Sequence, residues 1–318
     1  MNFVTVNTSA FNTLSDNYRK NLNIVSASQE LKLCEFDALA DMVVEHCIAS
    51  GSWGEKFSFS SLQTLHEFFC ENEIHNFCLP HNAQLVGNLI SAVSNADKAS
   101  FADVVCNKLL KRCDGFSYAS FFEPVSMGET VAYVKNPLAE EAFDVFSIGF
   151  EDPRLKYATS IKKATQMVSD SVSDYCLLPL EESDGVRLTA TSELLFREGL
   201  KINDVTTVIG PYGDADMKYA LLSKHVRIPD SYDEEPWYFE FCVDADSNSG
   251  ISDLILAAEY LGNSLHKINT MTFDTEESET KRFFVILKSE SADFLPFLTY
   301  LKFFAADVCA VGIYKNLE

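Results

Sequence analysis

The first third of the chain carries apolar residues at a helical spacing. In the segments LKLCEFDALADMVVEHCIAS (31–50) and SFADVVCNKLLKRC (100–113), apolar side chains recur three and four positions apart, which is the spacing of one face of an α-helix. Gly, Ser and Pro residues then gather in residues 114–129, a composition that is typical of a connector. We therefore expect a helical region over residues 1–115.

From residue 130 the pattern changes to short apolar runs separated by amphipathic segments. The runs VAYV, LKYAT, DYCLLPL and VTTVI predict strands, and the segments PLAEEAFDVF, IKKATQMVSDSV and TATSELLFREGL predict the helices between them. Such alternation favours a parallel sheet covered by helices. Because DYCLLPL is apolar along nearly its whole length, we expect this strand to be buried on both faces. Residues 130–228 are therefore predicted to form an α/β domain.

Residues 236–318 predict a third part with a different order of elements. Strands are expected at WYFEFCVD, KINTMTFD, KRFFVILK and VCAVGIY, and helices at SDLILAAEYLGN and DFLPFLTYLKFF. This order is β-α-β-β-α-β, the arrangement of a ferredoxin-like domain. The predicted fold class is thus α/β and α+β, with a helical region, an α/β domain and a ferredoxin-like domain in succession.

Charge and cysteine content narrow the class of protein. The 318 residues contain 25 Lys and Arg against 47 Asp and Glu, a net charge of -22, which disfavours nucleic acid and anionic membrane surfaces as partners. The first twenty residues lack the basic and apolar regions of a signal peptide. The nine cysteines form no C-x-x-C pair and fit reduced thiols. We expect a cytoplasmic protein without a cofactor.

A short segment rich in His and Cys is a candidate metal site. HEFFCENEIHNFCLPH contains His66, Cys70, His75, Cys78 and His81, and their spacing of three and four residues would suit tetrahedral zinc on a helix. The phenylalanines between them, and the tendency of free Cys to be buried, favour ordinary core packing. We predict no metal here, and a zinc-bearing interaction protein remains an alternative.

One motif at the end of the central strand resembles a known family. Pro179, Leu180, Glu181, Glu182, Ser183 and Gly185 are similar to the proline, apolar, Glu-Asn-Ser and glycine signature of prephenate dehydratase. Glu182 replaces the asparagine, and the glycine comes one residue early. In that family a periplasmic-binding-protein-like catalytic part precedes a regulatory ACT domain, so the resemblance implies the same two parts over residues 130–318.

Further segments are similar to the family with key residues replaced. Lys135 and Asn136 stand in the place of the family's Gly-Pro-x-Gly loop, of which Pro137 remains. The catalytic Thr-Arg-Phe corresponds to Met217, Lys218 and Tyr219, and so the threonine is absent. In the ACT-like part, the effector motif Glu-Ser-Arg-Pro corresponds to Asn269, Thr270, Met271 and Thr272, and its Gly-Ala-Leu partner to Gly250, Ile251 and Ser252.

The resemblance also implies that one lobe is missing. In the family a whole second lobe lies between the hinge strand and the Thr-Arg-Phe strand. Here KINDVTTVIG is followed almost at once by DADMKYALLSK. We expect a single-lobe domain, without the opposite wall of a substrate cleft.

These correspondences give the candidate site residues. The catalytic candidates are Glu181, Glu182, Ser183, Lys218 and Tyr219, and the ligand-binding candidates are Lys135, Asn136, Gly250, Asn269 and Thr270. Glu181 and Glu182 could act as paired carboxylates in acid–base chemistry. Alternatively they cap the following helix together with Ser183.

The predicted function follows from the resemblance and from its departures. We expect a non-catalytic regulatory or scaffolding relative of prephenate dehydratase that binds a small amino-acid-like ligand and dimerises through its ACT-like domain. The alternative is an active prephenate dehydratase, which converts prephenate to phenylpyruvate in phenylalanine biosynthesis. An appended chorismate mutase is disfavoured, because the stretch 31–50 holds only Lys32 for a dicarboxylate pocket.

Overall fold

The chain is described by a computed structural model, in which contacts group it into two compact units. The structure describes residues 37, 40, 41, 43, 44, 95–123, 128–210, 216–226, 236–247, 249–274, 279–289, 293–305 and 307–317. One unit comprises Met1–Phe121, Asn248–Asn263 and Asp293–Val308, and the other comprises Phe122–Ser247, Ser264–Ala292 and Cys309–Glu318. The domain boundaries that the sequence predicts at residues 115, 130, 228 and 236 remain predictions.

The first unit is helical in its described part. Its elements are α5 (Asn95–Arg112), the 3-10 helix η2 (Tyr118–Ser120), α9 (Ile251–Tyr260) and α10 (Leu295–Phe304). Helix α5 packs against α9 and α10, and the ring of Phe101 lies 6.3 Å from that of Phe303. The Tyr118 hydroxyl accepts a hydrogen bond from the backbone nitrogen of Phe294 at 2.8 Å. The helix predicted at 100–113 is confirmed by α5.

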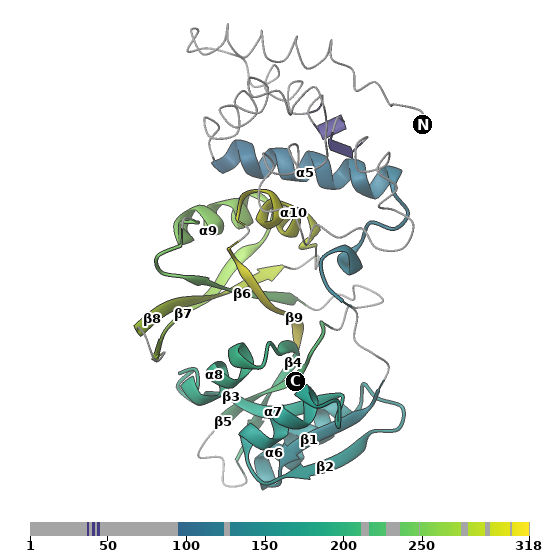
Figure 1. Cartoon of the computed structure of the whole chain (residues 1–318), viewed down its shortest axis with the longest axis vertical. Coiled ribbons are helices and arrows are strands. Elements are labelled where there is room, and N and C mark those ends of the chain that lie inside the picture. Colours follow the sequence, from purple (N-terminus) through teal and green to yellow (C-terminus); the bar gives the residue numbers. More distant parts are fainter. Residues whose placement is uncertain are drawn as a thin grey trace, which may run out of the picture. The chain divides into compact units, whose positions relative to one another are not determined.

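The second unit is built on one mixed sheet, whose strands run in the order β2-β1-β3-β5-β4-β9-β6-β8-β7. The strands are β1 (Thr130–Val134), β2 (Arg154–Ala158), β3 (Tyr175–Glu182), β4 (Lys201–Ile209), β5 (Asp216–Ser223), β6 (Trp237–Asp244), β7 (Ser264–Asp274), β8 (Glu279–Ser289) and β9 (Cys309–Leu317). Its helices are α6 (Pro137–Ser147), α7 (Ile161–Ser169) and α8 (Thr189–Arg197). Figure 1 shows these three helices beside strands β1 to β5.

The α/β half of the sheet confirms the single-lobe prediction. Strand β1 pairs in parallel with β2 and β3, as the alternating pattern predicts. Strand β5 is antiparallel to both β3 and β4, so this half of the sheet is mixed, while the four strands of the alternating pattern run parallel. Because β4 ends at Ile209 and β5 begins at Asp216, the chain between them is too short to hold a second lobe.

The ferredoxin-like half has the predicted order of elements, β6-α9-β7-β8-α10-β9. Its strands lie side by side as β9-β6-β8-β7, and each neighbouring pair is antiparallel. Strand β9 also pairs in parallel with β4, where Ile202 lies opposite Gly312. This pairing joins the two halves into one sheet. A Cβ atom at Gly312 would lie 2.2 Å from the carbonyl oxygen of Ile202, so only glycine fits there.

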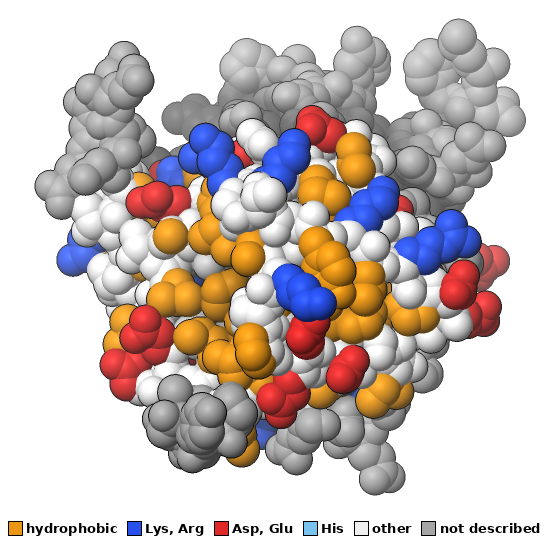
Figure 2. Space-filling view, turned by 90° about the horizontal axis from the view of Figure 1, so that it is seen from below, with side chains coloured by type: hydrophobic (Ala, Val, Ile, Leu, Met, Phe, Trp, Pro, Cys, Tyr) orange, Lys and Arg blue, Asp and Glu red, His pale blue; other side chains and the backbone are white. Residues whose placement is uncertain are grey.

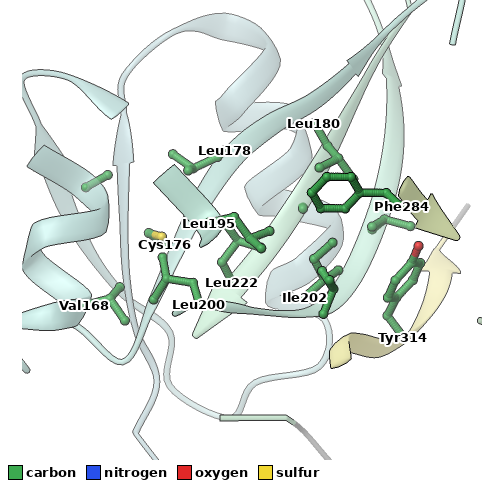
Figure 3. Close-up of a cluster of buried hydrophobic side chains, with 14 of the residues drawn as sticks. Val168, Cys176, Leu178, Leu180, Leu195, Leu200, Ile202, Leu222, Phe284 and Tyr314 are labelled. Carbon is green, nitrogen blue, oxygen red and sulfur yellow. The ribbon is translucent and has the colours of Figure 1, made fainter. Parts of the chain in front are cut away.

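Two apolar clusters fill the two faces of the sheet. On one face, side chains of β3, β4 and β5, among them Leu178, Ile202 and Leu222, pack with Phe284 and Tyr314 of the ferredoxin-like half (Figure 3). On the other, Tyr133 stacks on Phe143 of α6 with 5.7 Å between ring centroids. Successive residues of β3 alternate between the clusters, which confirms that this strand is buried on both faces.

The surface of the second unit mixes apolar and charged side chains. Ile148, Leu155 and Tyr157 are among its exposed apolar residues. Figure 2 shows one face of the molecule, on which apolar side chains lie among Lys, Arg, Asp and Glu. Among the described residues, no helix is long and apolar enough to cross a membrane.

Candidate functional site

The carboxylate of Glu181 lies between two lysines at the end of β3. Pairing of β3 with β5 places Glu181 opposite Lys218, and Glu181 Oε2 is 3.4 Å from Lys218 Nζ. Glu181 Oε1 is 3.0 Å from Nζ of Lys267 on β7. Glu181 is only 3% exposed. Both of its oxygens are therefore engaged by ammonium groups that come from two different strands.

The loop after β3 also contacts Lys267. Lys267 Nζ also donates a hydrogen bond to the carbonyl oxygen of Gly185 at 2.6 Å. Gly185 adopts a φ of 78°, a left-handed conformation that costs glycine little and other residues more. The motif glycine thus turns the chain so that its carbonyl faces Lys267.

A second ion pair lies beside Glu181 and is fully buried. Arg187 forms a backbone bridge with Glu181, and its Nη1 is 2.5 Å from Oε1 of Glu240 on β6. The Nε of Arg187 donates to Ser192 Oγ at 2.9 Å, and the hydroxyl of Tyr314 donates to Glu240 Oε2 at 2.9 Å. This network connects the loop before α8 to β6 and β9.

Arg187 also packs against an aromatic ring, and its Nη2 makes no hydrogen bond to the described residues. Its guanidinium lies 4.8 Å from the ring centroid of Phe284, within the range of a cation–π contact. The Nη2 atom is buried. Arg187 is therefore held mainly by Glu240 and by the aromatic ring.

The surroundings of Glu181 carry a surplus of positive charge. Two ammonium groups face one carboxylate, and the side chains of Lys218 and Lys267 are 29% and 28% exposed. The pKa of nearby His266 is lowered by burial first and then by the charges of Lys218, Lys267 and Lys288, which Glu181 only partly offsets. In a chain of net charge -22, this is a locally cationic region.

Tyr219 and Asn136 form a separate contact. The Tyr219 hydroxyl lies 3.5 Å from Asn136 Oδ1, and the same oxygen accepts a hydrogen bond from the backbone nitrogen of Ala139 at 2.9 Å, which caps α6. Burial raises the pKa of Tyr219, and the contact with Asn136 partly counters this. Lys135 instead lies at the surface, 3.3 Å from Glu140. The segment between β1 and α6 therefore provides a helix cap and a surface ion pair.

The capping hypothesis for Glu181, Glu182 and Ser183 is wrong. Helix α8 begins only at Thr189, its N-cap is Leu188, and no side chain caps it. The chain makes a turn and the bridge to Arg187 before the helix begins. Glu182 is exposed and lies opposite Met217 in the pairing of β3 with β5. The two glutamates therefore differ, since Glu181 is buried and ion-paired while Glu182 points to solvent.

The remaining predicted residues fall in different places. Asn269 is partly buried on β7, and its Nδ2 has no hydrogen-bond partner among the described residues. Thr270 is exposed, and Gly250 belongs to the helical unit. His66, Cys70, His75 and Cys78 lie outside the described residues. Within the described ranges, no three His, Cys, Asp or Glu side chains are grouped as a metal site would require.

The similarity of this chain to known proteins lies in its fold. No protein-family model matches the sequence, and no curated protein matches it either. Solved structures do match the fold. The chain is similar in fold to prephenate dehydratases.

Three solved structures illustrate the similarity. Prephenate dehydratase from Streptococcus mutans is 14% identical at a TM-score of 0.46, over 59% of this chain and 98% of that one. The enzyme from Arthrobacter aurescens, in complex with L-Phe, is 11% identical at 0.43, over 59% and 90%. A quorum quenching acylase, GqqA, is 15% identical at 0.42, over 58% and 94%. At these values no site residue is carried over from prephenate dehydratase or from the acylase.

Proposed function

We propose that this chain is a non-catalytic regulatory or scaffolding relative of prephenate dehydratase that binds a small amino-acid-like ligand. The observation that carries the proposal is the buried carboxylate of Glu181, whose two oxygens are taken up by Lys218 and Lys267. A general acid or base must lie within hydrogen-bond reach of the substrate atom that it protonates or deprotonates. Both carboxylate oxygens of Glu181 instead contact lysines of the chain itself.

The dehydratase reaction requires cationic groups, a proton donor and exclusion of water, which this site does not provide together. Prephenate carries two carboxylates, which require cationic or hydrogen-bonding groups, and its leaving hydroxyl requires a proton donor. Two lysines facing one glutamate leave a single surplus charge. The resemblance puts the catalytic threonine at Met217, and a thioether donates no proton. With β5 following β4 directly, a second lobe that would exclude water is also missing.

The same region is better suited to a ligand with one carboxylate than to prephenate with two. One surplus positive charge, on two partly exposed ammonium groups, matches one carboxylate of an amino acid. Lys267 and Asn269 are two residues apart on β7 and so share a face of the strand. The unpaired Nδ2 of Asn269 is a donor on that face. We propose that Lys218, Lys267 and Asn269 form the ligand site.

Calorimetric titration tests the ligand site. The full chain is titrated with a panel of free α-amino acids and with the amines that lack their carboxylates. We expect one or more amino acids to bind, with phenylalanine weak, and the matching amines not to bind. Lys267→Met should weaken binding at least about tenfold, because a charge-assisted bond contributes about 1.5–3 kcal/mol. Lys163→Met, at an exposed lysine of α7, is the matched control. Equal binding of acids and amines would contradict the proposal.

We further propose that the chain forms a homodimer through its ferredoxin-like half. Because β9 pairs with β4, β7 is the open edge of this half, pairing within the described residues with β8. Leu265 and Ile268 on β7 are 37% and 40% exposed. An open edge with exposed apolar residues is commonly covered by pairing with another strand. A second copy of β7 would cover both edges by two-fold symmetry.

A further inference from the structure

Two cysteines face each other across neighbouring strands of the sheet. Cys242 on β6 lies directly opposite Cys309, the first residue of β9, in an antiparallel pair. Such opposed residues have Cα atoms about 4.5–5.5 Å apart, and disulfides span about 4.4–6.8 Å between Cα atoms. The two side chains are close enough for Cys242 to have the largest influence on the pKa of Cys309. Their backbone positions thus suit a disulfide without a change of strand register.

The two thiols differ in exposure. Cys309 is exposed, whereas Cys242 is buried at 2% exposure within the apolar cluster. The other described cysteines, Cys106, Cys113 and Cys176, are also buried. A reagent from solvent would therefore meet Cys309 before any other thiol of the described residues.

Charged groups from neighbouring strands surround Cys309. Its Sγ lies 3.8 Å from the carbonyl oxygen of Ala310, to which Lys201 of β4 donates at 2.6 Å. The hydrogen bond from Cys242 lowers the pKa of Cys309 to about 6, with help from Lys201 and Arg282 and against burial and the charge of Asp244. The pKa of Cys242 is raised by the same hydrogen bond and by burial. Cys309 is therefore the nucleophile of the pair.

We propose that Cys309 and Cys242 form a reversible disulfide by exchange with a low-molecular-weight disulfide such as glutathione disulfide. The Cys309 thiolate attacks one glutathione sulfur, the S–S bond breaks, and one glutathione leaves as a thiolate. Cys242 then loses its proton to solvent and attacks the Cys309 sulfur, which releases the second glutathione. Two cysteine thiols are oxidised, and one glutathione disulfide is reduced to two glutathiones.

The position of the disulfide gives it a structural effect. Strand β9 lies between β4 and β6, so it belongs to the contact between both halves of the sheet. Cys242 is two residues after Glu240 and shares its face of β6. Oxidation would fix β9 to β6 beside the buried pair of Glu240 and Arg187. This inference does not depend on the proposed ligand or on the absence of catalysis.

Peptide mapping tests the disulfide. The folded full chain is equilibrated in glutathione buffers of increasing oxidised fraction, quenched in acid, alkylated, digested and analysed by mass spectrometry. We expect a linked pair of peptides containing Cys242 and Cys309, which dithiothreitol separates. Cys242→Ala should instead accumulate Cys309 bound to glutathione, several-fold above the native chain, because the resolving thiol is missing. Cys113→Ser, at a thiol of the helical unit, is the matched control and should keep the link.

The pH dependence of alkylation gives a second measurement. The rate at Cys309, followed in its own peptide, should rise with pH with a midpoint near pH 6, the pKa of Cys309, and level off only at pH values well above it, where the thiolate is fully formed. Cys242→Ala and Lys201→Met should each move this midpoint to higher pH. A native chain that keeps Cys242 free while Cys309 carries glutathione would overturn the proposal. So would a midpoint unchanged in both variants.

Discussion

At the scale of single residues, the strongest constraint described in the sheet unit is the pair of Arg187 and Glu240. Both side chains are essentially without solvent contact, at 1% and 0% exposure. Removing one partner from such a pair leaves an uncompensated charge in a medium of low dielectric. The pair therefore fixes the loop after β3 to β6 more firmly than any surface ion pair would.

Replacing Arg187 should destabilise the fold strongly. We expect Arg187→Met to lower the free energy of unfolding by about 3–5 kcal/mol, since Glu240 is left buried and unpaired. Adding Glu240→Gln removes the orphaned charge and keeps an acceptor for Tyr314, so the double variant should recover about half of the loss. Urea unfolding followed by circular dichroism measures both.

The control for this change is an exposed arginine. Arg197→Met removes a surface contact with Glu198, in which the arginine is 55% exposed, and should cost about 0–1 kcal/mol. Equal losses for Arg187→Met and Arg197→Met would show that the buried pair does not contribute as described.

Some residues of the site could be predicted from sequence and others could not. Glu181 and Lys218 could be predicted as members of one site, because each lies in a segment that resembles a motif of prephenate dehydratase. Lys267 reaches Glu181 from β7, a strand far away in sequence, so no local pattern indicates that contact. Glu240 had a usable signal, because a glutamate in the otherwise apolar run WYFEFCV requires a buried partner.

At the scale of elements, the pairing of β4 with β9 makes one sheet from two predicted domains. The order β-α-β-β-α-β could be predicted, because each strand and helix has its own local periodicity. The parallel pairing with β4 could not, since it depends on close approach of two distant backbones at Gly312. A glycine within the strand VCAVGIY is the only local sign of that approach.

Filling the space at Gly312 should separate these strands. We expect Gly312→Ala to cost about 1–3 kcal/mol, because the new Cβ would lie 2.2 Å from the backbone oxygen of Ile202. Gly115→Ala has no heavy atom within 4 Å of its Cβ and should be nearly neutral. Denaturant unfolding of the two variants compares them, and an equal midpoint would contradict the described register.

At the scale of the whole molecule, the proposed dimer predicts that a charge placed on β7 lowers the molar mass from that of a dimer to that of a monomer. The native chain should be dimeric at micromolar concentration by light scattering. Ile268→Lys places a charge on the open edge of β7 and should give monomers. Ile209→Lys, at a residue of β4 that is 57% exposed, should stay dimeric. A native chain that is monomeric, or an Ile268→Lys chain that is still dimeric, would place the interface elsewhere.

The central claim is that Glu181 serves structure and ligand binding and not the dehydration of prephenate. Formation of phenylpyruvate from prephenate by the purified full chain tests it most directly. We predict no formation above the rate without protein, because the carboxylate is engaged by Lys218 and Lys267 and no second lobe excludes water. Turnover above about one per second, an ordinary enzyme value, that is lost in Glu181→Gln and kept in Lys163→Met would contradict the account.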